Sequence, residues 1–343
     1  MSEFPRFEER YDHERGFSLY FSEHLSPILM SLERERRQKL FLYFLALAIL
    51  WGGLGLFAYA EIHEKGLNAE RVLSVLGLIL FAYFPSGLIK HFFEKKAKAV
   101  VMPEIMAFFP NAKYTVDSHV KVSDIKDFLI VPYYTHAEGA DLICYSEKFS
   151  LSYLRLKYRR GTSRQGDNNI TFYGLCILMS LNKRVSDPIA IKVDDGRVIN
   201  WFKNLGTGYE RISMGPNAFE KMFEVYGKNK NEVRSVLTVE LMELFLKLNF
   251  LFANLIITPP EMDNQIKKVL SGWNGWRGKE GDQSGLMANF MGDRLLLLIP
   301  TSEAMFKPAS LFKSCTDTTA IRTILYQIKL LDSVYEILVR NLK

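Results

Sequence analysis

The sequence predicts an α+β protein in which a two-helix transmembrane hairpin is followed by a soluble domain with a mixed or antiparallel sheet and packed amphipathic helices. Three observations predict this class. Two long uncharged runs lie within the first 90 residues, later segments alternate apolar and polar residues as strands do, and two further segments repeat apolar residues at helical spacing. Because strands and helices do not alternate regularly, an α+β domain fits better than a doubly wound fold.

Composition and charge narrow the function classes. The chain has 343 residues, 48% of them hydrophobic and 24% charged, with a net charge of +6. Much of the positive excess flanks the apolar runs, so we expect no nucleic-acid partner. Cys144, Cys176 and Cys315 are far apart and lack CxxC spacing, which predicts buried free thiols in place of disulfides or a zinc site.

The predicted spans are residues 40–60 and 72–89, which have lengths of 21 and 18 residues without a charge. A helix rises ~1.5 Å per residue and a bilayer core is roughly 30 Å thick, so each run is about long enough to cross it. Pro85 falls near the end of the second run, where a lost backbone bond is least harmful. Residues 1–39 precede the first run and no small-residue cleavage site follows it, which disfavours a cleaved signal peptide.

The flanking charges predict the orientation of the hairpin. Four basic residues precede the first run and four follow the second, whereas the connector carries only Lys65 and Arg71. Positive residues favour the cytoplasmic side, so both termini are expected there. The predicted regions are a cytoplasmic N-terminal helical segment at 1–39, the hairpin at 40–98 and a cytoplasmic α+β domain at 99–343. The basic residues are Arg34, Arg36, Arg37, Lys39, Lys90, Lys95, Lys96 and Lys98.

The N-terminal segment carries an apolar stripe at helical spacing. Ser26-Pro27 supplies a helix start. The stripe either packs on the soluble domain or lies at the lipid interface, and its shortness favours packing. Its members are Phe21, Leu25, Ile28, Leu29 and Leu32.

In the C-terminal domain, Leu151–Arg160 and Thr171–Leu181 alternate apolar and polar residues and flank a polar Gly-containing stretch, which predicts a hairpin. Helical spacing of apolar residues predicts helices over Asn231–Leu248 and Thr318–Asn341. Further expected strands are Ile189–Val193, Phe219–Tyr226, Leu251–Thr258 and Arg294–Ile299.

Three segments, in this order after the paired runs, carry a family resemblance: ITFYGLCILMSLNKR at 170–184, FEKMFEVYGKNKNEVRSVLTVELMELFLKL at 219–248 and GDRLLLLIP at 292–300. The chain resembles an uncharacterised family of bacterial two-pass membrane proteins, the domain of unknown function 3137. The resemblance implies a bacterial inner-membrane protein with a cytoplasmic domain and a LemA-type membrane protein as a partner. It implies no functional residues, and residues 259–285 fit it least well, as an insertion would.

No strong catalytic motif is present: the chain lacks GxxxxGK[ST], GxSxG, HExxH and a glycine fingerprint after a strand. Gly206-Thr207-Gly208 lacks the third glycine of a phosphate loop, since position 211 is Arg, and predicts a turn. His136-Ala137-Glu138 matches half of a zinc deaminase signature without the PCxxC half. Asp194-Asp195-Gly196 predicts a tight turn, although paired carboxylates can bind a cation. We therefore assign no catalytic, cofactor-binding or metal-binding residue and expect no cofactor.

Two segments are predicted contact surfaces. The basic hairpin suits anionic lipid headgroups or an acidic partner, while a solvated hairpin tip is the favoured alternative. The glycine-rich loop at 271–285 carries two tryptophans, which either contact a partner or the bilayer, or fold back onto the domain. The residues concerned are Lys157, Arg159, Arg160 and Arg164 in the hairpin, and Trp273, Trp276 and Arg277 in the loop.

The leading hypothesis is a non-enzymatic, membrane-anchored scaffold or adaptor that presents the α+β domain to a protein partner. An enzyme acting on a lipid or membrane-bound substrate is the main alternative, and it requires distant polar residues such as His136, Glu138 and Asp195 to converge in a pocket. A subunit of an oligomeric transport assembly is a third hypothesis. The expected partners are thus the lipid bilayer, another protein and further copies of this chain.

Overall fold

The structure is a computed structural model that describes residues 5–65, 69–159, 168–193, 208–215, 217–253, 285–301 and 306–341. The chain divides into two compact units. One comprises Met1–Phe108 and Phe306–Leu325, and the other Phe109–Met305 and Tyr326–Lys343. The helix α10, Thr319–Asn341, contributes its first turns to the first unit and the remainder to the second.

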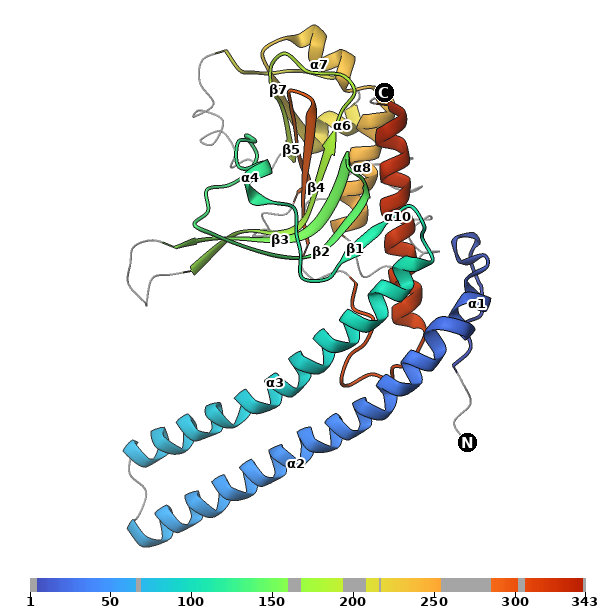
Figure 1. Ribbon diagram of the computed structural model, residues 1–343. Helices are drawn as coiled ribbons and strands as arrows, with labels where there is room; N and C mark the ends of the chain where they lie inside the picture. Colours follow the sequence, from blue (N-terminus) through green and yellow to red (C-terminus); the bar gives the residue numbers. More distant parts are fainter. Residues whose placement is uncertain are drawn as a thin grey trace. The chain divides into compact units, whose positions relative to one another are not determined.

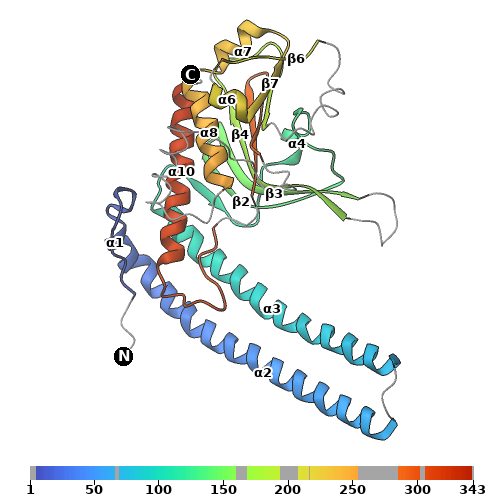
Figure 2. The ribbon, with the colours of Figure 1, turned by 180° about the vertical axis from the view of Figure 1, so that it is seen from behind.

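The first unit is helical. It contains η1 (Asp12–Glu14), α1 (Phe17–Tyr20), a π-helical turn η2 (Phe21–Leu25) and two long helices, α2 (Ser26–Lys65) and α3 (Ala69–Ala107). The two long helices lie side by side (Figures 1 and 2). The helical path therefore begins well before Ser26, where the sequence predicted its start.

The N-terminal stripe lies in the core of this unit. Phe21, Leu25, Leu29 and Leu32 are buried, whereas Ile28 is half-buried. Phe17 also packs edge-on against Phe108, with ring centroids 5.0 Å apart. The helical periodicity thus places the stripe against the unit's own side chains.

The predicted transmembrane hairpin is wrong. Within the part of the chain that the structure describes, no helix is long and apolar enough to cross a membrane. Residues 40–60 form no separate span: they belong to the 40-residue helix α2, which also carries charged turns. Most side chains of the run at 72–89 lie outside the described residues.

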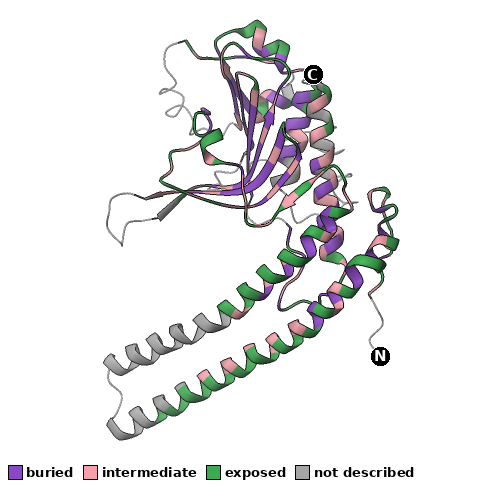
Figure 3. Ribbon diagram, viewed as in Figure 1, coloured by how far each residue is buried: buried purple, intermediate pink, exposed green. Residues whose placement is uncertain are grey.

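The finding on the hairpin also overturns the predicted location. A multi-pass inner-membrane protein with both termini in the cytoplasm requires two spanning helices, and the described residues contain none. Several apolar side chains of α2 are nevertheless exposed, as the green and pink segments of this helix in Figure 3 illustrate. They include Phe41, Phe44, Ile49, Trp51, Leu56 and Tyr59.

The second unit is built on a nine-stranded antiparallel sheet, in the order β1-β2-β3-β4-β9-β8-β5-β7-β6. Successive side chains of a strand point to opposite faces of the sheet. Leu295 to Leu298 in β9 are all fully buried, so both faces of the sheet are covered at this central strand. The strands are β1 (Lys113–Thr115), β2 (His136–Ser146), β3 (Phe149–Arg159), β4 (Asn168–Ser180), β5 (Ile189–Val193), β6 (Glu210–Arg211), β7 (Phe223–Gly227), β8 (Met287–Met291) and β9 (Arg294–Pro300).

Helices and an irregular segment cover the two faces of the sheet. On one face lie α8 (Val239–Ala253) and residues 326–341 of α10 (Figures 1 and 2). The segment around α4 (Val122–Ile125) packs on the other, where Phe128 joins a core that includes Leu156. The buried Asn289 ties this segment to the sheet, because its Oδ1 accepts from the Leu129 amide at 2.8 Å.

Several predicted elements differ from the structure in their bounds or type. The predicted helix Asn231–Leu248 is two helices, α7 (Lys230–Val236) and α8, because Thr238 caps a new start by accepting from the Leu241 amide at 3.3 Å. The predicted strand Phe219–Tyr226 begins within the helix α6 (Asn217–Met222). Leu251 to Ala253 are helical, and residues 254–258 lie outside the described residues.

Candidate functional site

The outer ends of β2, β3 and β4 form a surface that we call the ribbon patch. Pairing aligns His136, Lys157 and Ile170 in one row and Glu138, Arg155 and Tyr173 in the next. The two rows share a face because a bulge at Thr171 adds one residue to β4, which restores the side-chain alternation. The patch thus comprises these six side chains.

Ionic and aromatic contacts order the ribbon patch. Lys157 Nζ lies 2.6 Å from Glu138 Oε1, and Arg155 Nη1 lies 3.9 Å from Glu138 Oε2. The hydrogen bond from Lys157 lowers the pKa of the Glu138 carboxyl. The Arg155 guanidinium also stacks 4.5 Å from the Tyr173 ring centroid, and Ile170 remains 55% exposed beside these groups.

Of the predicted contact residues, only Lys157 has a side chain that the structure describes. Lys157 is in the ribbon patch, where it forms an ion pair with Glu138. Arg159 ends β3, but its side chain lies outside the described residues. The remaining predicted contact residues also lie outside them, so their roles stay predictions: Arg160, Arg164, Trp273, Trp276 and Arg277.

His136 and Glu138, which match half of the deaminase signature, contact side chains that belong to no metal site in the described part of the chain. His136 Nδ1 lies 3.0 Å from Thr135 Oγ1, and Glu138 is bound to Lys157. Among the described residues, no group of three His, Cys, Asp or Glu side chains could hold a metal ion. Asp194 to Gly196 lie outside that part of the chain, as do Gly206 and Thr207.

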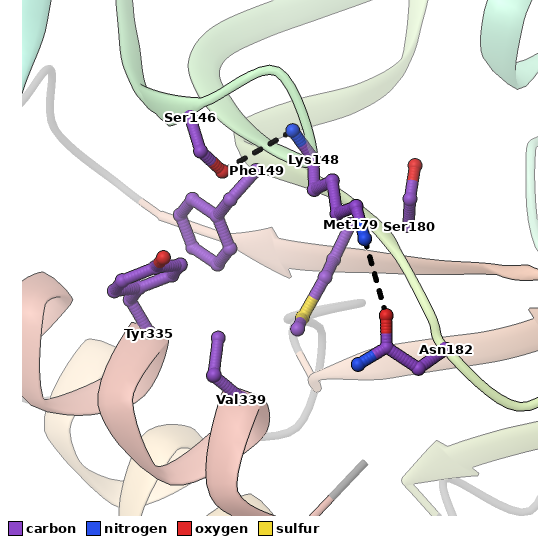
Figure 4. Close-up of a pocket in the computed structure, with 8 residues that line it drawn as sticks. All are labelled: Ser146, Lys148, Phe149, Met179, Ser180, Asn182, Tyr335 and Val339. Atoms are coloured by element: carbon purple, nitrogen blue, oxygen red, sulfur yellow. Dashed lines mark hydrogen bonds between the residues drawn. The ribbon is translucent and has the colours of Figure 1, made fainter. Parts of the chain in front are cut away.

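A pocket of about 170 Å³ lies where the β2–β3 turn and the end of β4 meet α10 (Figure 4). One part of its lining is polar and carries a single formal charge, from Lys148. The other part is apolar, and its side chains converge on the space between sheet and helix. The polar residues are Ser146, Lys148, Ser180 and Asn182, and the apolar ones are Phe149, Met179, Tyr335 and Val339.

Hydrogen bonds and ring contacts fix the walls of the pocket. Lys148 Nζ donates to Asn182 Oδ1 at 3.2 Å, and its backbone amide donates to Ser146 Oγ at 3.2 Å. The Tyr335 ring lies 5.1 Å from Phe149 in an edge-to-face arrangement and stacks on Tyr145 at 5.3 Å. The apolar wall is therefore held by aromatic packing between helix and sheet.

Tyr145 lies behind this aromatic wall. Its ring is buried, and among the described residues its hydroxyl has no hydrogen-bond partner. Burial, together with the nearby Asp332 carboxylate, raises the pKa of the Tyr145 hydroxyl well above its ordinary value of 10.0. The phenol is thus neutral at physiological pH and serves the wall as an aromatic surface.

The pocket was not predicted from the sequence, because β2 was not among the predicted strands. The signal was present: the apolar run Leu142 to Tyr145 precedes the polar turn residues Ser146 to Lys148, which the strand from Phe149 follows. Two runs separated by a short polar turn predict a hairpin. The contribution of Tyr335 required the tertiary structure, since helical spacing alone indicates only that its face is apolar.

Comparisons with known proteins give limited matches. No curated protein is detectably similar to the sequence. One solved structure, titled "crystal structure of the mycobacterial trehalose monomycolate transport factor A, TtfA", aligns over 69% of this chain and 94% of that chain at 9% identity. With a TM-score of 0.28, it supports no argument about fold or function. A family model described as "Protein of unknown function (DUF3137)" matches residues 170–257. Residues 170–257 therefore carry a domain of unknown function.

Proposed function

We propose that this protein is a non-enzymatic scaffold or adaptor that binds a protein partner through the ribbon patch. The observation that carries the proposal is Ile170, which is 55% exposed at the outer end of β4. Ile170 pairs with Lys157, which is bound to Glu138, and the next row holds Arg155, which stacks on Tyr173. An exposed apolar side chain with Arg and Tyr in the neighbouring row has the composition of a protein–protein contact.

The charge of the patch favours an acidic partner. Within the six residues of the patch, two cations, Arg155 and Lys157, face one carboxylate, Glu138, which leaves a net charge of one positive unit. Such charges steer association and lose strength as salt screens them. A LemA-type protein, which the sequence resemblance implies, is one partner to test.

The experiment is affinity purification of the full chain in mild detergent, with mass spectrometry and then reconstitution with the purified partner. We expect the double variant Ile170→Ser, Lys157→Ser to weaken binding about tenfold or more, since truncation of an interface hot spot costs about 2 kcal/mol or more. Binding should also weaken as salt is raised.

A matched control is the double variant Val239→Ser, Lys228→Ser. Val239 is 57% exposed, and Lys228 forms an ion pair with Asp187 at 3.4 Å. The control should bind as the unaltered chain does. Equal affinity of the patch variant and the control would contradict the proposal, as would loss of binding only in a Trp273→Ala, Trp276→Ala variant.

A further inference from the structure

The pocket between the β2–β3 turn and α10 shares no residue with the ribbon patch, and the one charged side chain in its described lining is a cation. Its polar lining consists of the Lys148 ammonium, the Asn182 amide and two serine hydroxyls. Among the described residues no carboxylate lines it, and the acidic neighbours in sequence, Glu147 and Glu336, are exposed and outside the lining. A ligand group that enters there meets hydrogen-bond donors and one positive charge.

The donors of this lining are available. Asn182 Oδ1 accepts from Lys148 Nζ, which orients the amide so that its Nδ2 group is left to donate elsewhere. The Lys148 ammonium has three N–H groups, and one of them donates the hydrogen bond to Asn182 Oδ1. A carboxylate in front of Lys148 would therefore gain charge-assisted hydrogen bonds without breaking an ion pair that the structure shows.

The remaining half of the pocket is apolar. Met179 comes from β4, and Tyr335 and Val339 are one turn apart on α10 (Figure 4). At about 170 Å³ the cavity is smaller than the ~300–1,000 Å³ of typical cofactor and drug sites, so it fits a short apolar group and not a nucleotide.

From this geometry we infer a binding site for a short apolar group that bears a carboxylate. The carboxylate pairs with Lys148 and Asn182, and the apolar group lies against Met179, Tyr335 and Val339. Two sources share this chemistry, a free short-chain carboxylic acid and the C-terminal residue of a polypeptide. The inference is independent of the adaptor proposal, because it concerns other residues.

The test is calorimetric titration of the full chain with hexanoate and with the peptide Gly-Gly-Leu, each beside a neutral counterpart, hexanol or the peptide amide. The carboxylate forms should bind at least about tenfold more tightly than the neutral forms, because hydrogen bonds to charged groups are the stronger kind. Binding of hexanoate alone identifies a free acid as the ligand, and binding of the peptide alone identifies a chain terminus.

Two variants locate the binding. Lys148→Met removes the ammonium but keeps the apolar stem and should weaken carboxylate binding about tenfold, while Lys183→Met, an exposed neighbour outside the lining, should not change it. Val339→Phe should block both probes by filling the cavity. Equal binding of charged and neutral probes, no binding of any probe, or unchanged affinity in Lys148→Met would overturn the inference.

Discussion

Glu33 is a buried carboxylate in the helical unit. Arg36 and Arg37 donate to it from the following turn, at 2.7 and 3.0 Å, and the Cys315 amide donates at 2.9 Å from a segment far along the chain. These bonds, of which the one from Arg36 is the largest cause, hold the pKa of the Glu33 carboxyl at about 2, below its ordinary 4.5. The ionised carboxylate thus joins α2 to the segment around Cys315.

Replacing Glu33 by Gln should lower the free energy of unfolding by about 3 kcal/mol at neutral pH, since each pKa unit corresponds to about 1.4 kcal/mol. The folded-state pKa lies below the unfolded value. The contribution is therefore fully present above pH 4.5 and is lost as pH falls towards 2. Thermal unfolding of both proteins across this range measures it. A difference in Tm that is constant from pH 7 to pH 2 would contradict the account.

At the scale of elements, the join between β4 and β9 depends on one residue without a side chain. A Cβ at Gly174 would overlap the Ile299 carbonyl oxygen and come within 2.8 Å of Pro300 Cα. The last ladder pair, Gly174 with Pro300, brings the two backbones together at that point. The close approach explains why this position in β4 is glycine.

Gly174→Ala should destabilise the chain by about 1–3 kcal/mol, the usual range for overpacking, because the neighbouring backbone has to move. Denaturant unfolding measures the change. Gly52→Ala in α2 is the control: its Cβ would meet no atom within 4 Å, and Ala suits a helix better by about 0.5–1 kcal/mol. Similar stabilities of the two variants would show that β9 can shift without cost.

For the molecule as a whole, the exposed apolar residues of α2 dominate the expected behaviour in water. Phe41, Ile49 and Leu56 are 67%, 65% and 74% exposed on one helix. Exposed apolar side chains gathered on one helix promote association with other apolar surfaces more than exposed residues scattered over the chain do. The net charge of +6 opposes self-association only through long-range repulsion, which salt screens.

The triple variant Phe41→Ser, Ile49→Ser, Leu56→Ser should bind less of a hydrophobic fluorescent dye and self-associate less in light scattering. The control replaces three scattered exposed residues, Leu19, Val100 and Val239, by Ser. This control should match the unaltered chain, and an equal effect of both triple variants would exclude a particular role for the exposed side chains of α2.

By itself the sequence determined the elements with strong local patterns. The hairpin of β3 and β4 and the helix α10 lie where alternation and helical spacing predicted them, because these periods reflect burial of one face. Only the tertiary structure decided the rest. Pairing across the chain aligned Glu138, Arg155 and Tyr173, and packing of α10 on the sheet brought Tyr335 to Lys148. The long uncharged runs predicted spans that the described residues do not contain. An uncharged length is a local property, and only the tertiary structure decides what surrounds a helix.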